Sequence, residues 1–335
     1  MSSVYAAFRS IGAYVPEKIL TNADLEKMVD TSDEWITKRT GIKERRLAAD
    51  DEVTSDMGAK AAAIAIERAR IDKEAIDLVV CATLTPDYFT MPSTATVIAD
   101  KLGIRGAQAF DISAACSGFV YSLSVAKAFI ESGMKKNVLI VGSEKLSTVL
   151  DWSDRGTCIL FGDGAGAAVI SATENKNEAI IDVLAGADGK YRDLLITPSP
   201  GAVHPMSQEA LDQGLNFLRM KGNETFKLAV KTLTKDVKEI LAKNNIDPAT
   251  IPHFIPHQAN YRIIKAVGDA LGMTEEQVVL TIHKYGNTSA ASIPMAINDL
   301  YEAGGLKPGE LMLLDTFGGG LTWASAVLPF AGEKC

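Results

Sequence analysis

The stretch 109–133, AFDISAACSGFVYSLSVAKAFIESG, joins a short apolar run, a run of small residues and a helical pattern. Residues 109–112 predict a buried strand, and residues 113–118 are small or polar. Beyond them, apolar residues fall mostly on one helical face, and Ser132-Gly133 is a typical stop signal. We therefore expect Cys116 to lie in a sharp turn between a strand and a helix.

Such a turn would favour Cys116 as a nucleophile. Small neighbours let a ligand approach the backbone, and the positive end of a helix dipole favours a thiolate. Main-chain N–H groups of the same turn can stabilise a developing oxyanion. A cysteine among alanines is also a common core residue, so this stretch alone is compatible with both a nucleophile and a core filler.

The other cysteines have no comparable setting. Cys81 and Cys158 lie in apolar runs and predict core positions, and Cys335 is terminal. The chain contains no C-x-x-C pair, the pattern typical of metal and redox sites, and a reducing cytosol disfavours disulfides. We expect no metal site.

Histidines are the natural partners of a nucleophile, and the chain has four. His204 lies in a segment rich in Pro and Gly and predicts a loop, and His253 begins an apolar run. His257 ends the run 254–256 and precedes a predicted amphipathic helix, whereas His283 precedes the small-residue segment 286–292. His257 is thus expected at a strand end.

An internal repeat relates the two halves of the chain. The pattern from Leu78 to Val141 returns from Phe254 to Leu314. Counting back from Glu131 and Glu302 sets Cys116 opposite Asn287, and pairing Val80 with Pro256 sets Cys81 opposite His257. Alternating strands and helices predict mostly parallel sheets, whose sites collect at the C-terminal strand ends. A pseudo-twofold between halves 1–175 and 176–335 would bring Cys116, His257 and Asn287 into one pocket.

Composition excludes several classes of function. The chain has 335 residues, 47% of them hydrophobic, and a net charge of −8, which disfavours a nucleic-acid surface. No stretch reaches the roughly 20 apolar residues of a membrane span, and the N-terminal residues lack a signal-peptide pattern. We expect a cytoplasmic enzyme that binds neither nucleic acid nor membrane.

The chain resembles the β-ketoacyl-[acyl carrier protein] synthase III family of condensing enzymes over essentially its whole length. The resemblance rests on many motifs in the same order, at residues 31–42, 114–118, 154–157, 161–167, 222–224, 256–260, 286–292 and 317–320. It implies an α/β thiolase-like fold with two pseudo-twofold-related halves in αβαβα layers. It also implies a homodimer that initiates fatty acid synthesis.

The resemblance implies a role for each matching residue. Cys116 would take an acyl group, most simply acetyl, from a CoA thioester. His257 and Asn287 would stabilise the enolate formed when malonyl-acyl carrier protein loses CO₂. The amides of Cys116 and Gly319 would hold the tetrahedral oxyanion, and Phe317 would shield the carbanion from water. No metal or redox cofactor is implied, because acyl-CoA is a substrate.

The resemblance also implies residues for substrate binding. Trp35 and Arg155 would sandwich the CoA adenine, with Thr31 and Arg39 nearby. The pantetheine channel would be lined by Gly222, Phe226, Ala259 and Asn260. Acyl carrier protein would dock on Arg262, Lys227 and Lys265, beside a lysine stripe at positions 227, 231, 235 and 238 that is also typical of a solvated helix face.

Two features depart from the family pattern. Met91, ahead of Pro92, stands where acetyl-selective members carry a phenylalanine that caps the partner's acyl pocket, and Phe89 lies just before it. A pliable methionine predicts a pocket that accepts more than acetyl. Residues 197–218 form a longer segment than is usual, and the sequence does not distinguish a flap from a surface insertion.

Three other functions are compatible with parts of this pattern. A thioesterase or cysteine hydrolase would share the Cys–His pair, but Asn287 and the Phe317 loop suit a carbanion better. A condensing enzyme of specialised metabolism would use the same triad with another acyl donor. A silent homologue that only binds acyl carrier protein would lack a triad member, and Cys116, His257 and Asn287 are all present.

Overall fold

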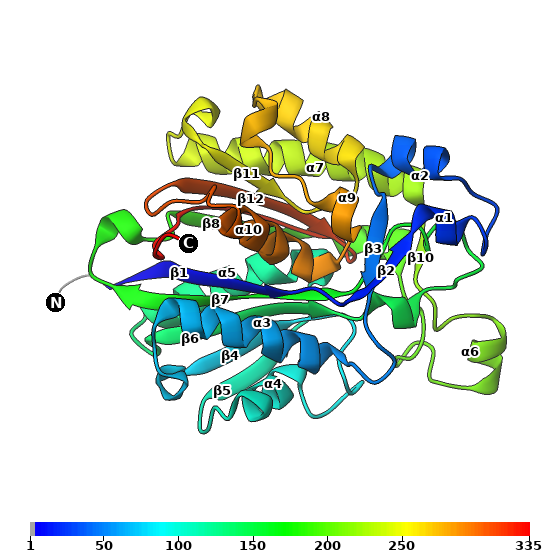
Figure 1. Cartoon of the computed structure of the whole chain (residues 1–335), viewed down its shortest axis with the longest axis horizontal. Coiled ribbons are helices and arrows are strands. Elements are labelled where there is room, and N and C mark those ends of the chain that lie inside the picture. The colour runs from blue at the N-terminus through cyan, green and yellow to red at the C-terminus, as the bar shows by residue number, and fades with distance from the viewer. Residues whose placement is uncertain (1–3) are drawn as a thin grey trace.

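The computed structural model describes residues 4–335, and two β-sheets organise it (Figure 1). The first sheet has the strand order β1-β7-β6-β4-β5, and the second has the order β11-β12-β13-β8. In each sheet a parallel part adjoins an antiparallel part. The first sheet comprises β1 Tyr5–Tyr14, β4 Leu78–Ala82, β5 Gln108–Ile112, β6 Asn137–Glu144 and β7 Gly164–Thr173; the second comprises β8 Asp182–Ala187, β11 His253–Pro256, β12 Leu311–Gly318 and β13 Thr322–Pro329.

Helices form three layers around these sheets (Figure 1). Helices α3 and α4 cover the outer face of the first sheet, α7 and α8 cover the outer face of the second, and α5 and α10 lie between the sheets. This αβαβα arrangement confirms the predicted fold. The helices are α1 Asn22–Leu25, α2 Asp33–Thr40, α3 Thr54–Ala69, α4 Thr94–Leu102, α5 Gly118–Glu131, α6 Gln208–Asp212, α7 Gly222–Lys243, α8 Tyr261–Leu271, α9 Ile282–Tyr285 and α10 Ser292–Glu302.

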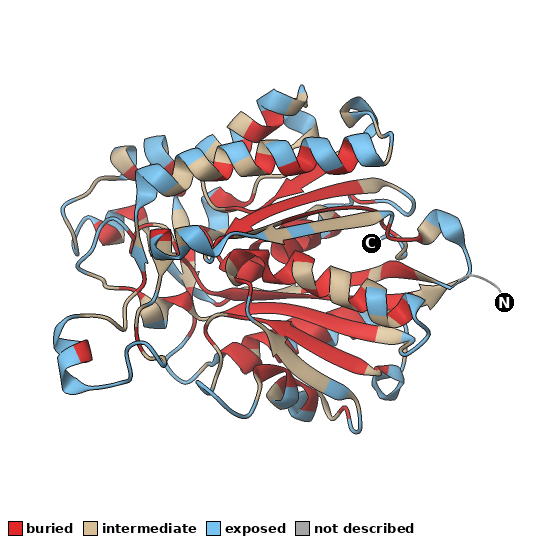
Figure 2. Ribbon diagram, turned by 180° about the vertical axis from the view of Figure 1, so that it is seen from behind, coloured by how far each residue is buried: buried red, intermediate tan, exposed pale blue. Residues whose placement is uncertain are grey.

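The central strands are buried along most of their length because helices cover both of their faces. In β6, Val138 and Ile140 join the core between the sheets, whereas Leu139 and Val141 pack under α3. The burial view shows these strands as continuous buried ribbons (Figure 2). By contrast, β5 is an edge strand and only partly buried, so a strand is present at 109–112 as expected, but the expectation that it is buried was wrong.

The internal repeat is present, with a corrected register. β6 begins at Asn137 and β12 at Leu311, 174 residues later, and both have eight residues. The same offset relates the starts of α5 and α10, so Cys116 corresponds to Ala290 and not to Asn287. Counting from the helix ends failed because α5 has 14 residues and α10 has 11. The strand pairs Cys81↔Val141 and Pro256↔Asp315 likewise set Cys81 opposite Pro256.

Several segments lie outside the repeat. The hairpin of β2 (Lys18–Thr21) and β3 (Glu44–Leu47) and the pair β9 (Leu195–Ile196) and β10 (Arg219–Met220) form small sheets. Residues 197–218 form a projecting loop that contains α6 (Figures 1 and 2). No helix within residues 4–335 is long and apolar enough to cross a membrane.

Candidate active site

One cavity of about 1200 Å³ brings together the three residues expected to react. Cys116, His257 and Asn287 line it with Phe317, and all four side chains are buried. They come from the 3₁₀ turn Ala115–Ser117, the residue after β11, the approach to α10 and the end of β12. Both halves therefore contribute to the site, at the C-terminal ends of parallel strands.

The turn that carries Cys116 is held tightly from β12. Ala115 has a φ of +46°, a left-handed conformation that is costly for a non-glycine residue. Thr316 Oγ1 donates to the Cys116 carbonyl over 2.9 Å. A Cβ on Gly318 would lie 2.7 Å from the Cys116 nitrogen, so only glycine allows this approach. The sequence did not single out Thr316 or Gly318.

The Cys116 thiol is protonated in the resting site. Helix α5 does begin just behind it, at Gly118, but burial raises the pKa of Cys116 to about 12. Removing a charge from water outweighs the attraction of a helix terminus here. Burial thus opposes the thiolate that the helix start favours, and acylation requires a group that accepts the thiol proton.

His257 is a neutral hydrogen-bond donor. Its Nδ1 lies 2.5 Å from Ser292 Oγ, and the same oxygen accepts from the Gln258 amide. Ser292 is thus free to donate its own hydrogen to Nδ1, and we assign the imidazole hydrogen to Nε2. Burial lowers the pKa of His257 to about 3, so the ring is uncharged near neutrality. Nε2 is buried and has no partner among residues 4–335.

Asn287 presents a second donor. Its Oδ1 accepts from the Ser289 amide over 2.8 Å, which leaves the Nδ2 hydrogens for a ligand. Its backbone is fixed by two bonds, from its amide to the Leu160 carbonyl at 2.8 Å and from the Gly162 amide at 3.1 Å. Two N–H donors beside a thiol suit the stabilisation of an oxyanion better than the abstraction of a proton.

The outer part of the cavity contains the predicted CoA residues. The guanidinium of Arg39 lies 4.2 Å from the centre of the Trp35 ring, and that of Arg155 lies 5.1 Å from it. Trp35 and Arg39 line the cavity, whereas Thr31 and Arg155 do not. An adenine between Trp35 and Arg155 would have to displace the Arg155 side chain, which now donates to the Asp30 carbonyl.

The predicted pantetheine residues Gly222, Phe226, Ala259 and Asn260 all line the same cavity. Asn260 also joins two elements, because its Oδ1 caps α8 and its Nδ2 donates to the Arg39 carbonyl over 3.0 Å. A hydrogen bond therefore joins the predicted channel wall to the helix that carries Trp35.

The predicted docking residues differ in position. Arg262 and Lys227 line the cavity mouth, with the Arg262 guanidinium 5.1 Å from the centre of the Phe226 ring. Lys265 lies outside the lining and pairs with Asp269 at 2.9 Å. All four lysines of the stripe are exposed, and Lys231 and Lys235 border a separate cavity of about 250 Å³.

A second cavity of about 660 Å³ also reaches Cys116. Phe89 and Gly319 line it, whereas Met91 does not and is 77% exposed. The projecting segment supplies part of its wall through Thr197, Ser199, Pro200, Asn216 and Leu218. Residues 197–218 therefore shape the surroundings of the thiol and are more than a surface insertion.

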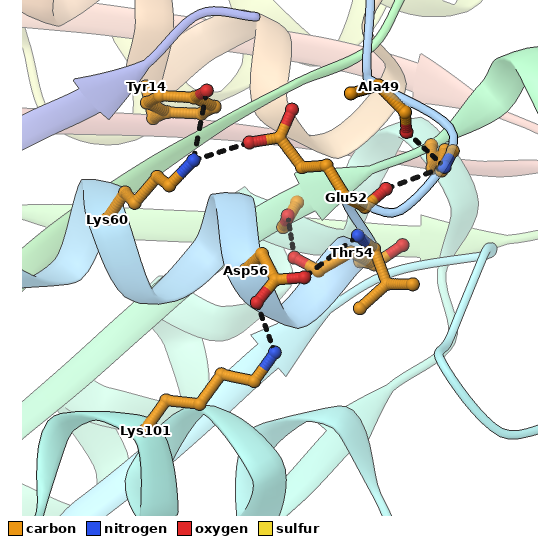
Figure 3. Close-up of polar contacts among 10 residues, drawn as sticks. Tyr14, Ala49, Glu52, Thr54, Asp56, Lys60 and Lys101 are labelled. Atoms are coloured by element: carbon orange, nitrogen blue, oxygen red, sulfur yellow. Dashed lines mark hydrogen bonds and ion pairs between the residues drawn. The ribbon is translucent and has the colours of Figure 1, made fainter.

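Val53 and Thr54 also line this cavity, and they belong to a segment held by a polar cluster (Figure 3). Lys60 donates to Glu52 at 2.5 Å and to the Tyr14 hydroxyl at 3.1 Å, and Lys101 pairs with Asp56. Thr54 Oγ1 donates to the Thr85 carbonyl at 2.5 Å. These contacts fix the wall before any ligand arrives.

Ser289 and Ser292 are further site residues that the sequence reasoning missed. Both lie in the segment 286–292 that contains Asn287, so their small polar side chains were the available signal. Within residues 4–335 there is no group of three or more His, Cys, Asp or Glu that could hold a metal ion.

Comparison with known proteins agrees with this geometry. The family model of 3-oxoacyl-[acyl-carrier-protein] synthase III matches residues 110–189, and the model of its C-terminal part matches residues 241–330. A β-ketoacyl-[acyl-carrier-protein] synthase III of Sulfurovum sp. is 79% identical over 99% of this chain and 97% of the relative. The chain belongs to the β-ketoacyl-[acyl-carrier-protein] synthase III family.

Two further members of the synthase III family are similar along the whole chain. The Sulfurimonas denitrificans protein is 71% identical over 98% of this chain and 99% of its own. The crystal structure of the Aquifex aeolicus 3-oxoacyl-[acyl-carrier-protein] synthase III is 46% identical, covers 97% of this chain and 99% of its own, and has a TM-score of 0.89. The protein is accordingly an acyltransferase of the condensing class with a thiolase-like fold.

Proposed function

We propose that the enzyme condenses an acyl-CoA, most simply acetyl-CoA, with malonyl-acyl carrier protein to give 3-oxoacyl-acyl carrier protein, CoA and CO₂. The family and its activity as a condensing enzyme are shown by the relatives, whereas the role of each residue is our proposal. The observation that carries it is the convergence of one thiol and two neutral N–H donors in one buried cavity.

In the first half-reaction Cys116 attacks the thioester carbonyl and forms an acyl-cysteine, releasing CoA. The amides of Cys116 and Gly319 would hold the oxyanion that forms on this carbonyl. The acyl chain would occupy the cavity of about 660 Å³, which Cys116 and Gly319 both line. That volume exceeds the need of an acetyl group, in line with a pocket that also accepts longer primers.

In the second half-reaction His257 Nε2–H and Asn287 Nδ2–H would donate to the malonyl thioester oxygen. Loss of CO₂ leaves an enolate, and donors aimed at its oxygen stabilise the charge as it forms. The enolate carbon attacks the acyl-cysteine, and the thiolate leaves. Phe317, only 7% exposed, would keep water from this carbanion. These steps need no metal or redox cofactor.

The substrates would approach along the larger cavity. We propose that Trp35, Arg39 and Arg155 bind the adenine end of CoA, assisted by Thr31. Lys227 and Arg262, at the cavity mouth, are the favoured contacts for the acidic carrier protein, and Lys265 is the weaker candidate because Asp269 already pairs with it. Enzymes using CoA and carrier-protein thioesters fit the cytoplasmic location predicted from the sequence.

We also propose a homodimer of chains built from the halves 1–175 and 176–335. The loop after β4 exposes the apolar side chains of Tyr88, Phe89 and Met91 at 55%, 64% and 77%. Such a patch is typical of an interface, and Met91 would then reach the partner's acyl cavity. Analytical ultracentrifugation should give a dimer. Met91→Phe should narrow the range of acyl-CoA chain lengths that the enzyme accepts and leave the protein a dimer.

Intact-mass analysis after mixing with acetyl-CoA tests the assignment. The wild type should gain one acyl group, and Cys116→Ala should gain none. His257→Ala and Asn287→Ala should still be acylated but lose release of labelled CO₂ by about 10²–10³-fold. A hydrolase would release acid and no CO₂, and a silent binding homologue would form no adduct. Either outcome would refute the proposal.

A further inference from the structure

The protonated Cys116 thiol needs a proton acceptor, and His257 is not suited to be one. In the tautomer set by Ser292, His257 Nε2 holds the hydrogen and Nδ1 receives one, so neither nitrogen has a lone pair available to the thiol. The acceptor must therefore be sought elsewhere around the turn that carries Cys116.

Glu144, the last residue of β6, is a fully buried carboxylate beside this turn. A Cβ on Gly142 would lie 2.3 Å from the Ala290 carbonyl, so this face of β6 abuts the 3₁₀ turn Ser289–Ala291. Because side chains two residues apart in a strand share a face, Glu144 points to the same side as that contact. The strand thus directs a carboxyl group toward the turn that holds Ser289.

The two oxygens of the Glu144 carboxylate accept very different numbers of hydrogen bonds. Its Oε2 accepts from Thr85 Oγ1 at 2.6 Å, Thr83 Oγ1 at 3.1 Å, and the Leu84 and Thr85 amides at 3.1 and 3.2 Å. Its Oε1 receives only a 3.3 Å bond from the Leu84 amide. Leu84 and Thr85, which bind the carboxylate, line the same cavity as Cys116.

Ser289 begins the 3₁₀ turn Ser289–Ala291, which packs both against β6 and against the turn Ala115–Ser117 that carries Cys116. Its hydroxyl is buried, lines the cavity of Cys116, and has no fixed partner of full hydrogen-bond geometry among residues 4–335. Burial raises the pKa of the Cys116 thiol, and it raises the pKa of Glu144 to about 7. In both cases the nearby Ser289 hydroxyl lowers the pKa and so offsets part of the rise. Ser289 also has a φ of +50°, a strained backbone for a serine.

We propose that Glu144 accepts the proton of the Cys116 thiol during acylation, with the Ser289 hydroxyl passing it between them. The thiol S–H bond breaks as Ser289 Oγ takes that hydrogen and gives its own to Glu144 Oε1. The sulfur electron pair then forms the bond to the acyl carbon, and the CoA thiolate leaves and takes a proton from solvent. In the condensation step Cys116 leaves as thiolate and recovers the proton from Glu144 by the reverse path.

Other charged groups surround Glu144 without offering a second path. Lys145, its neighbour, donates to the carbonyls of Ala49, Asp50 and Glu52. The charges of Asp87 and Asp111, like that of Glu144, act on the buried thiol of Cys81 in β4. Asp111 accepts two amide bonds from the start of α4, and Asp87 accepts one from Ser55. On the side of the serine turn, Cys116 is the titratable neighbour.

The relay rests on the proposed acyl-cysteine chemistry, and its test is the pH profile of acylation. The rate at which acetyl-CoA acylates Cys116 should be measured by rapid quench and intact mass from pH 5 to 9. In the wild type it should rise with pH and level off with an inflection near the Glu144 pKa of about 7. Glu144→Gln should remove the inflection and lower the plateau by about 10²-fold or more, with an unchanged KM for acetyl-CoA.

A glycine variant separates the relay from a structural role of Ser289. Ser289→Gly relieves the positive φ, so the fold should be retained or stabilised while the hydroxyl is lost. Acylation should nevertheless fall by at least about tenfold. A fully active Ser289→Gly enzyme would overturn the relay, and so would a Glu144→Gln enzyme that keeps the wild-type profile.

Two further variants serve as controls. Asp163→Asn changes another fully buried carboxylate, bonded to Ser147 and the Ala48 amide, and should keep the inflection. His257→Ala should also keep the inflection, because the histidine is not the proton acceptor. If the inflection were lost in His257→Ala and kept in Glu144→Gln, the acceptor would be His257. If the wild type forms no acyl adduct at any pH, the proposed function itself fails.

Discussion

The hydroxyl of Ser292 lies 2.5 Å from Nδ1 of His257, and this bond determines which imidazole nitrogen donates into the cavity. Without it the hydrogen could occupy either nitrogen. Ser292→Ala should therefore lower condensation by about tenfold, less than the ~10²–10³-fold loss on removing a donor outright, and leave acylation unchanged. Separate assays of acyl-enzyme formation and labelled CO₂ release distinguish the two steps. Ser10→Ala, which removes a buried hydroxyl bonded to the Ala65 carbonyl, is the matched control.

The neutral state of His257 also predicts how stability depends on pH. Its pKa is about 3 when folded, against a usual value of 6.5. The unfolded chain therefore binds a proton below pH 6.5 that the native chain refuses until about pH 3, so stability falls as the pH drops through this window. The full loss is on the order of 5 kcal/mol. The free energy of unfolding, measured with urea at several pH values from 7 to 4, should fall less steeply with falling pH for His257→Gln than for the wild type. The same pH dependence in both proteins would contradict the assignment.

Trp35 should affect the binding of CoA and not the chemistry. An indole that stacks on a base is worth about 1–3 kcal/mol, so Trp35→Ala should raise the KM for acetyl-CoA by about 5- to 150-fold with little change in kcat. Acetyl-pantetheine, which lacks the adenine, is the control substrate. Equal damage with both thioesters would show that Trp35 supports the fold of α2 instead.

Gly318 should be intolerant of a side chain. In Gly318→Ala the new Cβ would lie 2.7 Å from the Cys116 nitrogen and 3.2 Å from that of Ser117. Overpacking of this kind costs about 1–3 kcal/mol, and here it would displace the nucleophile as well. We expect a lower Tm together with slow acylation. Gly189→Ala is the control, since no atom of residues 4–335 comes within 4 Å of its added Cβ; a harmless Gly318→Ala would contradict the tight approach.

The layers and the position of Cys116 could be predicted because they depend on local patterns. The small residues at 113–118 between a strand and a helix predict the turn, and the repeated pattern predicts two facing halves. The register of the repeat could not be counted correctly, because it requires knowing where α5 and α10 begin. Their different lengths, 14 and 11 residues, are set by packing between the sheets.

The charge states of the site were beyond prediction for a different reason. A thiol at a helix start suggests a thiolate, but the cost of burial depends on the whole surrounding chain and reverses that expectation. Ser292 and Glu144 were likewise missed, since 35 residues separate His257 from Ser292 and 28 separate Cys116 from Glu144 in the sequence. The fold brings these residues together from segments that lie far apart in the sequence.

Burial of Cys116 has a consequence for how the enzyme withstands its chemical surroundings. Alkylating agents and peroxides react with thiolates, and at neutral pH a thiol with a pKa of about 12 exposes almost none. The residue Cys116 is only 5% exposed, so oxidants must also travel down the substrate channel to reach its sulfur. The resting enzyme is thereby protected from irreversible sulfur oxidation, and its nucleophile becomes vulnerable chiefly when the thiol loses its proton during acylation.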